Sequence, residues 1–176
     1  MNNYNKKWFL LIILSVIWGS SFILIKKGLD QLSPIQLGSL RIIFTSIVII
    51  VFSYKSLIKI KKEKWKWIVI TAYVGTFFPV YLVGFGQSEI DSGLASILTT
   101  LTPISTLVVG IFFFNLFFTK KQIVGLSIGL IGTFLLLYEG SLNSEVNIFF
   151  AVFIVITTIG YGTSVNLIKT HLTDIA

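Results

Sequence analysis

The stretch WGSSFILIK at residues 18–26 returns as YGTSVNLIK at residues 161–169. Five of the nine positions are identical, and the exchange of Trp18 for Tyr161 keeps an aromatic ring. This pattern indicates an internal repeat. If an odd number of membrane crossings separates the two copies, the second copy runs through the bilayer in the opposite direction to the first. Inverted repeats of this kind are typical of secondary transporters.

The composition favours a membrane protein. Of the 176 residues, 55% are hydrophobic and 12% are charged, whereas soluble domains carry roughly 25% charged residues. A transmembrane helix needs about 20 apolar residues, so the chain has room for about six such helices and for no additional soluble domain. We therefore expect an all-α membrane protein.

Six apolar runs predict the individual helices. The apolar runs and their flanking polar residues place these helices at residues 8–28, 34–54, 65–87, 93–118, 121–139 and 147–168. Ser33 followed by Pro34 is a typical helix start, because serine caps the free amide groups and proline suits the first turn. Asp91 or Ser92 can start the fourth helix in the same way.

The lysines predict the orientation. If the N-terminus is cytoplasmic, eleven lysines lie in cytoplasmic segments and only Lys26 and Lys27 lie outside. This asymmetry follows the positive-inside rule and predicts a multi-pass protein of the inner cell membrane. The long charged loop from Lys55 to Lys66 is interpreted as a topology anchor on anionic lipid, with a regulatory partner as the alternative.

Several function classes are excluded by the same residues. The net charge of +7 comes from loop lysines without a basic stripe interleaved with aromatic residues, so no nucleic-acid partner is expected. His171 is the only histidine, cysteine is absent, and the few carboxylates are spread over loops. We expect no catalytic residues, no metal site and no cofactor, and therefore no enzyme. His171 is expected to be solvated.

Five features follow one another along the chain: the stretch 18–26, Arg41 in the second helix, the lysine-rich second loop, Thr102-Pro103 in the fourth helix, and Gln122-x-x-Gly125 leading into Gly129-x-x-Gly132. In this order they resemble the EamA family of the drug/metabolite transporter superfamily. The resemblance implies a fold of ten helices in two inverted five-helix repeats, and the export or exchange of small metabolites, amino acids among them.

On this resemblance, residues 1–140 form the first five-helix repeat and residues 141–176 the first helix of the second. The bundle is then incomplete by four helices relative to the family fold. Leu116-Phe117 stands where many relatives have a Glu-Lys or Glu-Arg pair, so no role of that pair transfers to this chain.

Candidate site residues gather on the first, third, fourth and sixth predicted helices, where we expect a central cavity. Pro103 removes a backbone donor and should bend the fourth helix. The candidate gating residues are Arg41 and Lys26, with outward extension of Arg41 toward Glu89 or Asp91 as the alternative. The candidate substrate-binding residues are Trp18, Gly19, Tyr81, Thr102, Pro103, Tyr161 and Asn166. For the small and hydroxyl-bearing residues the alternative is simple helix packing.

These patterns together favour a transporter that exports or exchanges a small organic metabolite, amino-acid-like or amphipathic, by alternating access. Its partners are then the solute and the lipid bilayer. Two alternatives stay open. One is a truncated or split transporter that is inactive without a second copy, as in a homodimer, or without a complementing half. The other is a membrane scaffold or sensor that transports nothing.

Overall fold

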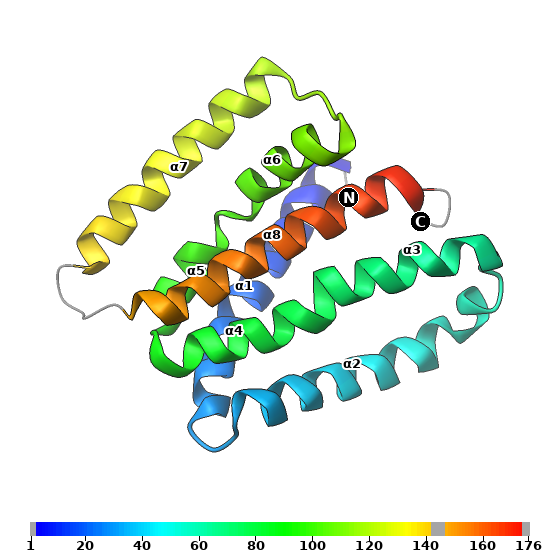
Figure 1. Cartoon of the computed structure of the whole chain (residues 1–176), viewed down its shortest axis with the longest axis horizontal. Helices are drawn as coiled ribbons and strands as arrows, with labels where there is room; N and C mark the ends of the chain where they lie inside the picture. The colour runs from blue at the N-terminus through cyan, green and yellow to red at the C-terminus, as the bar shows by residue number, and fades with distance from the viewer. Residues whose placement is uncertain (1–2, 142–146, 174–176) are drawn as a thin grey trace.

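The computed structural model describes residues 3–141 and 147–173, and every regular element in these ranges is helical. The elements are α1 (Asn3–Leu29), α2 (Pro34–Leu57), α3 (Lys62–Ala72), η1 (Tyr73–Phe77), α4 (Phe78–Glu89), α5 (Ser92–Thr99), α6 (Thr102–Phe114), α7 (Lys120–Ser141) and α8 (Ile148–His171). Figure 1 shows their arrangement. The predicted all-α fold is confirmed.

Five helical rods are long and apolar enough to cross a membrane: α1, α2, the continuous rod α3–η1–α4, the pair α5–α6, and α8. α7 is a sixth rod of 22 residues. The predicted helix starts are also found. The Ser33 hydroxyl accepts a hydrogen bond from the backbone amide of Gln36, and the side-chain oxygen of Gln36 accepts one from the backbone amide of Ser33. The Asp91 carboxylate accepts one from the backbone amide of Leu94. These reciprocal bonds satisfy amides that the first helical turn leaves free.

The fourth predicted span differs from its prediction. A continuous helix over 93–118 was expected, but α5 ends at Thr99, α6 begins at Thr102 and α6 ends at Phe114. The break precedes Pro103, which stands in the first turn of α6, where its missing amide costs no hydrogen bond. Asn115 then adopts a left-handed conformation with φ 50° and ends the helix.

The third span contains a single π-helical segment, η1, immediately before α4. Pro79 follows two residues later, in the first turn of α4. A proline inside a continuous helix removes one hydrogen bond and crowds the preceding turn, and a π-type turn accommodates both effects. The helix thus changes its type locally before Pro79.

α8 lies at the centre of the bundle, packed against α4, α6 and η1. Figure 1 shows it between the α3–α4 rod and the α5–α6 pair. Its contacts involve glycines. A Cβ on Gly160 would lie 2.6 Å from the carbonyl oxygen of Val74, and a Cβ on Gly86 of α4 would collide with Ile154. Small residues allow helices in a membrane to approach this closely.

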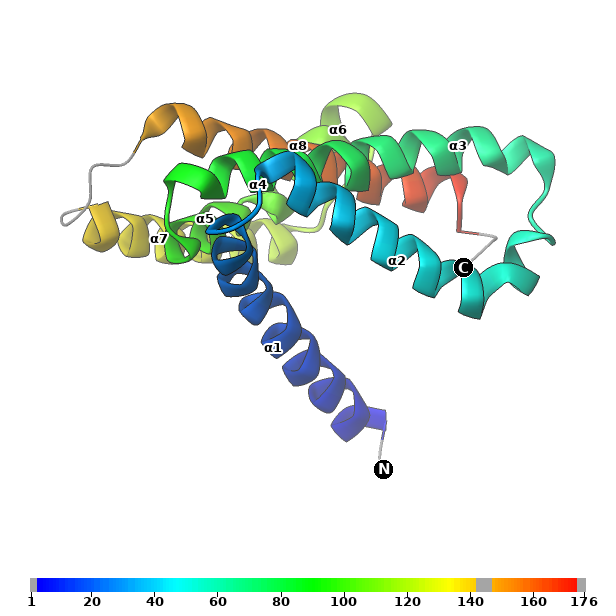
Figure 2. The same cartoon turned by 90° about the horizontal axis from the view of Figure 1, so that it is seen from below.

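α1 leans away from the rest of the molecule, as Figure 2 shows. Its residues 5–20 are all exposed, whereas Ile25 is buried and Phe22 and Leu29 pack against the apolar cluster that Ile25 forms with Val83 and other residues of α4, α5 and α8. In Figures 1 and 2, α1 runs toward the left of the view and α8 toward the right. The two copies of the repeat thus run in opposite general directions.

Candidate functional site

The closest helix contact of the candidate site joins α6 and α8. A Cβ on Gly162 would lie 2.6 Å from the amide nitrogen of Thr106 and 2.7 Å from the carbonyl carbon of Ser105. One turn before Gly162, the hydroxyls of Thr158 and Ser105 share a hydrogen bond of 2.9 Å. Because the contacting atoms of α6 belong to its backbone, only glycine at position 162 permits this distance.

Asn166 adds a second polar link across the same contact. Its side-chain amide donates to the carbonyl of Thr106 at 2.8 Å and to the carbonyl of Gly162 at 3.0 Å, and the residue is 1% exposed. We call the residues Ser105, Thr106, Thr158, Gly162 and Asn166 the α6–α8 seam. The seam places buried polar groups inside an otherwise apolar bundle, where each of them has a hydrogen-bond partner.

The break between α5 and α6 lies directly before this seam. The carbonyl of Thr99 loses its helical partner because Pro103 has no amide, and the hydroxyl of Thr102 donates to it instead at 2.7 Å. The hydroxyl of Thr106 in turn donates to the carbonyl of Thr102 at 2.8 Å. Thr100 and Leu101 keep helical backbone angles and donate to Ile97 and Leu98, three residues earlier, so the hydroxyl groups supplement the backbone hydrogen bonds of a tightened turn.

Lys26 connects the end of α1 to the end of α4. Its ammonium group donates to the carbonyl oxygens of Gln87 at 2.8 Å, of Ser88 at 3.3 Å and of Ile90 at 3.0 Å. A cation suits this position, because the last carbonyls of a helix lack amide partners and carry partial negative charge. The fully buried side chain of Gln87 returns a hydrogen bond of 3.3 Å to the carbonyl of Phe22.

Arg41 and Tyr161, predicted separately, are brought together. They lie on α2 and α8, both are partly buried, and the two side chains lie within electrostatic range of each other. Asp91, an alternative partner of Arg41, instead caps α5. Tyr81 faces α2 as well, where its hydroxyl lies 3.1 Å from that of Ser39.

Other predicted residues lie apart from the seam. Trp18 is 66% exposed on the free part of α1, and a Cβ on Gly19 would meet no atom within 4 Å. Pro103 is exposed and lines the space between α6 and α7. The structure therefore groups Thr102 and Asn166 around the α5–α6 break and the seam, and leaves Trp18 and Gly19 without neighbours in the described bundle. Their proposed roles stay predictions.

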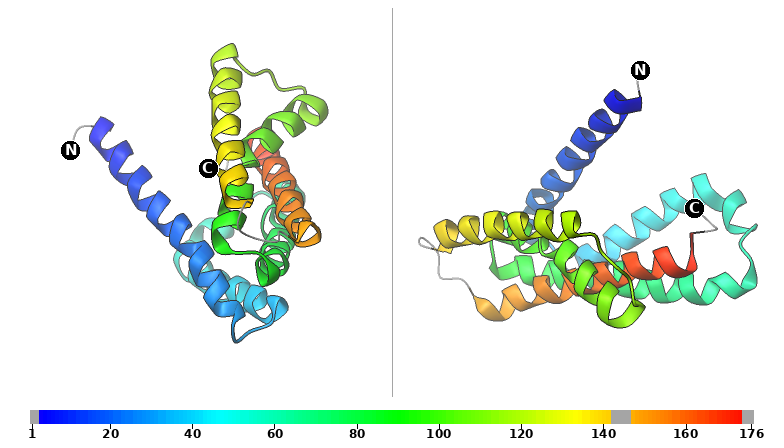
Figure 3. Two further views of the ribbon diagram at one scale, coloured as in Figure 1. Left: turned by 90° about the vertical axis from the view of Figure 1, so that its left-hand side faces the viewer. Right: turned by 90° about the horizontal axis from the view of Figure 1, so that it is seen from above.

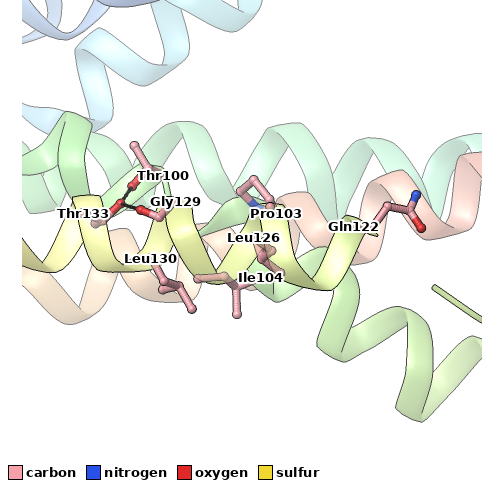
Figure 4. Close-up of a pocket in the computed structure, with 9 residues that line it drawn as sticks. Thr100, Pro103, Ile104, Gln122, Leu126, Gly129, Leu130 and Thr133 are labelled. Atoms are coloured by element: carbon pink, nitrogen blue, oxygen red, sulfur yellow. Dashed lines mark hydrogen bonds between the residues drawn. The ribbon is translucent and has the colours of Figure 1, made fainter. Parts of the chain in front are cut away.

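A groove of about 530 Å³ lies between the α5–α6 break and α7. Figure 4 shows Thr100 and Thr133 at one end of it and Gln122 at the other. The hydroxyls of Thr100 and Thr133 share a hydrogen bond of 2.8 Å, which connects α5 to α7. We call this space the α7 groove.

One contact that the sequence did not predict joins the start of α3 to the end of α8. The rings of Trp67 and His171 stack with centroids 3.6 Å apart and planes 3° from parallel, and Lys64 donates to the carbonyl of His171 at 2.7 Å. His171 was expected to be solvated, but it is partly buried by this stack. No local pattern reveals the pair, because Trp67 lies on the third predicted span and His171 lies beyond the last one, which was predicted to end at residue 168.

Comparison with known proteins shows what the chain is similar to. Residues 6–138 match the EamA-like transporter family. An uncharacterized transporter of Archaeoglobus fulgidus is 30% identical over 158 residues, which cover 88% of this chain and 54% of the relative. A probable amino-acid metabolite efflux pump of Salmonella typhimurium is 30% identical over 141 residues, covering 80% of this chain and 45% of the relative.

A protein of Escherichia coli, also described as a probable amino-acid metabolite efflux pump, is 27% identical over 136 residues, covering 77% of this chain and 44% of the relative. The chain thus spans about half the length of the curated relatives it matches. No solved structure matches it.

Proposed function

Because this chain belongs to the EamA-like transporter family, we propose that it moves a small organic metabolite across the inner cell membrane by alternating access. The solute is exported or exchanged, and it is amino-acid-like or amphipathic, in line with the efflux pumps among the relatives. The N-terminus is cytoplasmic, since the lysines concentrate on that side.

The observation that carries the proposal is the interrupted fourth span beside the second copy of the repeat. The break at Thr100–Leu101 separates α5 from α6 within one membrane-spanning rod, and Gly162 of the repeat contacts Thr106 just beyond it. Transporters place their substrate sites near the bilayer midplane, at repeat interfaces formed by interrupted helices. The α5–α6 break and its contact with Gly162 of the repeat support a substrate site at this place.

Within this proposal the residues have separate roles. Thr102, Pro103, Tyr161 and Asn166 surround the solute path at the break. Trp18, Gly19 and Tyr81 contribute to it when α1 closes on the bundle. Arg41 and Lys26 act as gating residues, because Arg41 couples α2 to Tyr161 of α8 and Lys26 couples α1 to the end of α4.

A second candidate is a transporter half that needs a complement. One observation favours it: residues 5–20 of α1 are exposed, which leaves this part of α1 open to a further helix. Residues 1–140 are then the first inverted repeat and residues 141–176 the beginning of the second, completed by a second copy or another polypeptide.

Solute export tests the proposal. Cells that make the protein should release at least one metabolite several-fold faster than cells that lack it. We expect Tyr161→Phe, which keeps the ring and removes the hydroxyl near Arg41, to lower that export at least fivefold. Tyr73→Phe, at an exposed position of η1, should leave it unchanged.

The pattern of failure separates the alternatives. Export that requires co-production of a complementing polypeptide supports the half transporter. No flux of any solute from a broad metabolite panel into proteoliposomes, with or without the complement, supports a scaffold or sensor and refutes transport.

A further inference from the structure

The α7 groove has the depth of one membrane leaflet. Its wall on α7 runs from Gln122 to Thr133, a length of about 16 Å at 1.5 Å per residue. This is about half of the roughly 30 Å hydrocarbon core. Because α7 extends from Lys120 to Ser141, Thr133 lies within one turn of the helix midpoint. The groove therefore begins at one membrane surface and ends near the bilayer centre.

The shape of the groove follows from how α6 and α7 diverge. The other wall consists of Thr100, Pro103 and Ile104, at the break and in the first turn of α6. Figure 3 shows α6 and α7 separating toward the segment that joins them. The groove is closed near the bilayer centre by the Thr100–Thr133 hydrogen bond and widens toward Lys120.

The walls suit a hydrocarbon chain better than a polar solute. Pro103, Ile104, Leu126 and Leu130 are apolar, and a Cβ on Gly129 would meet no atom within 4 Å, so the groove stays open there. The two threonine hydroxyls at the closed end already have partners. The two hydroxyl oxygens lie 2.8 Å apart, with the carbonyl of Ile97 2.6 Å from Thr100 and the carbonyl of Gly129 3.0 Å from Thr133, so that the two protons serve two of these three contacts.

The open end carries the groups that recognise an anionic headgroup. Lys120 and Lys121 are exposed at the start of α7, and each lysine near an anionic lipid surface contributes about 1 kcal/mol. Phe117, immediately before them, is 98% exposed, which is usual for an aromatic ring at the headgroup level. Two exposed cations thus precede Gln122, the residue of the groove lining nearest the start of α7.

We propose that the α7 groove binds one acyl chain of an anionic glycerophospholipid whose phosphate lies against Lys120 and Lys121. The lipid fills the space that the divergence of α6 and α7 leaves, and it supports α7, which contacts the bundle through α5. The proposal depends on membrane insertion and is independent of transport. Its failure and the failure of the proposed function are therefore distinguishable.

Native mass spectrometry of the purified chain tests this, with phosphatidylglycerol and phosphatidylcholine of identical acyl chains as probes. Gly129→Leu fills the groove and should weaken phosphatidylglycerol binding at least tenfold. Gly132→Leu is the matched control, because it makes the same change on the same helix, also into open space, but outside the groove lining.

The headgroup is tested at the surface. The double change Lys120→Gln and Lys121→Gln should reduce the preference for phosphatidylglycerol over phosphatidylcholine by roughly thirtyfold, at about 1 kcal/mol per lysine. Lys6→Gln with Lys7→Gln, an adjacent pair of exposed lysines at the start of α1, should keep the preference. The lysine changes lie on the surface. They therefore measure headgroup binding at this site even if the Gly129→Leu variant does not fold.

Three outcomes overturn the proposal. The first is equal lipid binding by Gly129→Leu and Gly132→Leu. The second is an unchanged headgroup preference without Lys120 and Lys121. The third is a wild-type dimer that Gly129→Leu dissociates while the number of bound lipids stays constant, which would mean that a second copy of the chain covers the groove.

Discussion

The two copies of the repeat have similar sequences and very different surroundings. In α8, Gly162 is buried against the backbone of α6, and Asn166 is bonded across the seam. In α1, the equivalent Gly19 has no neighbour within 4 Å, and the position equivalent to Asn166 is the exposed Ile23. The end of the motif reverses this order, since Lys26 is bonded to α4 and Ile25 is buried, whereas Lys169 and Ile168 are exposed.

This difference shows that the repeated motif does not determine how its residues are packed or buried. Glycine at its second position is compatible with a tight helix contact, and the partner helix decides whether that contact forms. In α8 the partner is α6, whose break at Thr100–Leu101 is followed by the backbone contact at Thr106. α1 is attached at its end near Lys26 and has no comparable contact near Gly19.

The largest test of the comparison uses the two glycines. We expect Gly162→Ala to lower the free energy of unfolding by about 3 kcal/mol, because the added methyl group meets backbone atoms at 2.6–2.7 Å and overpacking costs about 1–3 kcal/mol. Gly19→Ala should change it by less than about 0.5 kcal/mol. Unfolding in mixed micelles with increasing sodium dodecyl sulfate measures both. Equal losses would show that the two copies are packed alike.

A smaller effect is expected at the two lysines, in the opposite order. Lys26→Gln should lower the free energy of unfolding by about 2 kcal/mol, since hydrogen bonds to a charged group contribute about 1.5–3 kcal/mol and three carbonyls lose theirs. Lys169→Gln, at an exposed position, should leave it within about 0.5 kcal/mol. The same unfolding assay reads both variants. A larger loss at Lys169 would contradict the described contacts of α1 with α4.

The smallest expected effect concerns the equivalent hydroxyls of Thr158 and Ser15. Thr158→Val removes the hydrogen bond to Ser105 and should cost about 0.6 kcal/mol, the average for such bonds between membrane helices. Ser15→Ala should cost less, because that hydroxyl bonds only within α1 in the described contacts. A double-mutant cycle of Thr158→Val with Ser105→Ala isolates the interhelical term, and a coupling of zero would remove the hydroxyl pair from the seam.

The predictable parts of the fold are those encoded locally. The helix start at Ser33–Pro34 follows from neighbouring residues, and the structure has the expected capping bonds. The sequence predicts a bend at Pro103, whereas the structure has a break just before it. Proline indicates a missing amide, but it does not determine whether the helix bends around the proline or restarts at it. The candidate site was predictable only as a set of residue types.

Long-range contacts account for the rest. The stacking of Trp67 on His171 and the pairing of Arg41 with Tyr161 each join helices that are distant in sequence. The buried Gln87, whose amide oxygen has no partner among the described contacts, was also missed. Its burial depends on how α1 packs against α4. A glutamine within an apolar stretch of sequence does not predict that packing.

The sequence by itself determined that the chain is a set of apolar helices with a related pair near its two ends, and it pointed to the family. The reason is that each membrane span must satisfy its backbone hydrogen bonds within the helix itself. The length of a span, its apolar composition and its capping residues are therefore sufficient to predict the helices. Only the tertiary structure decided that α8 is buried at the centre and α1 leans outward. That choice depends on where glycines, hydroxyls and Asn166 meet the backbone of another helix, and no single span contains this information.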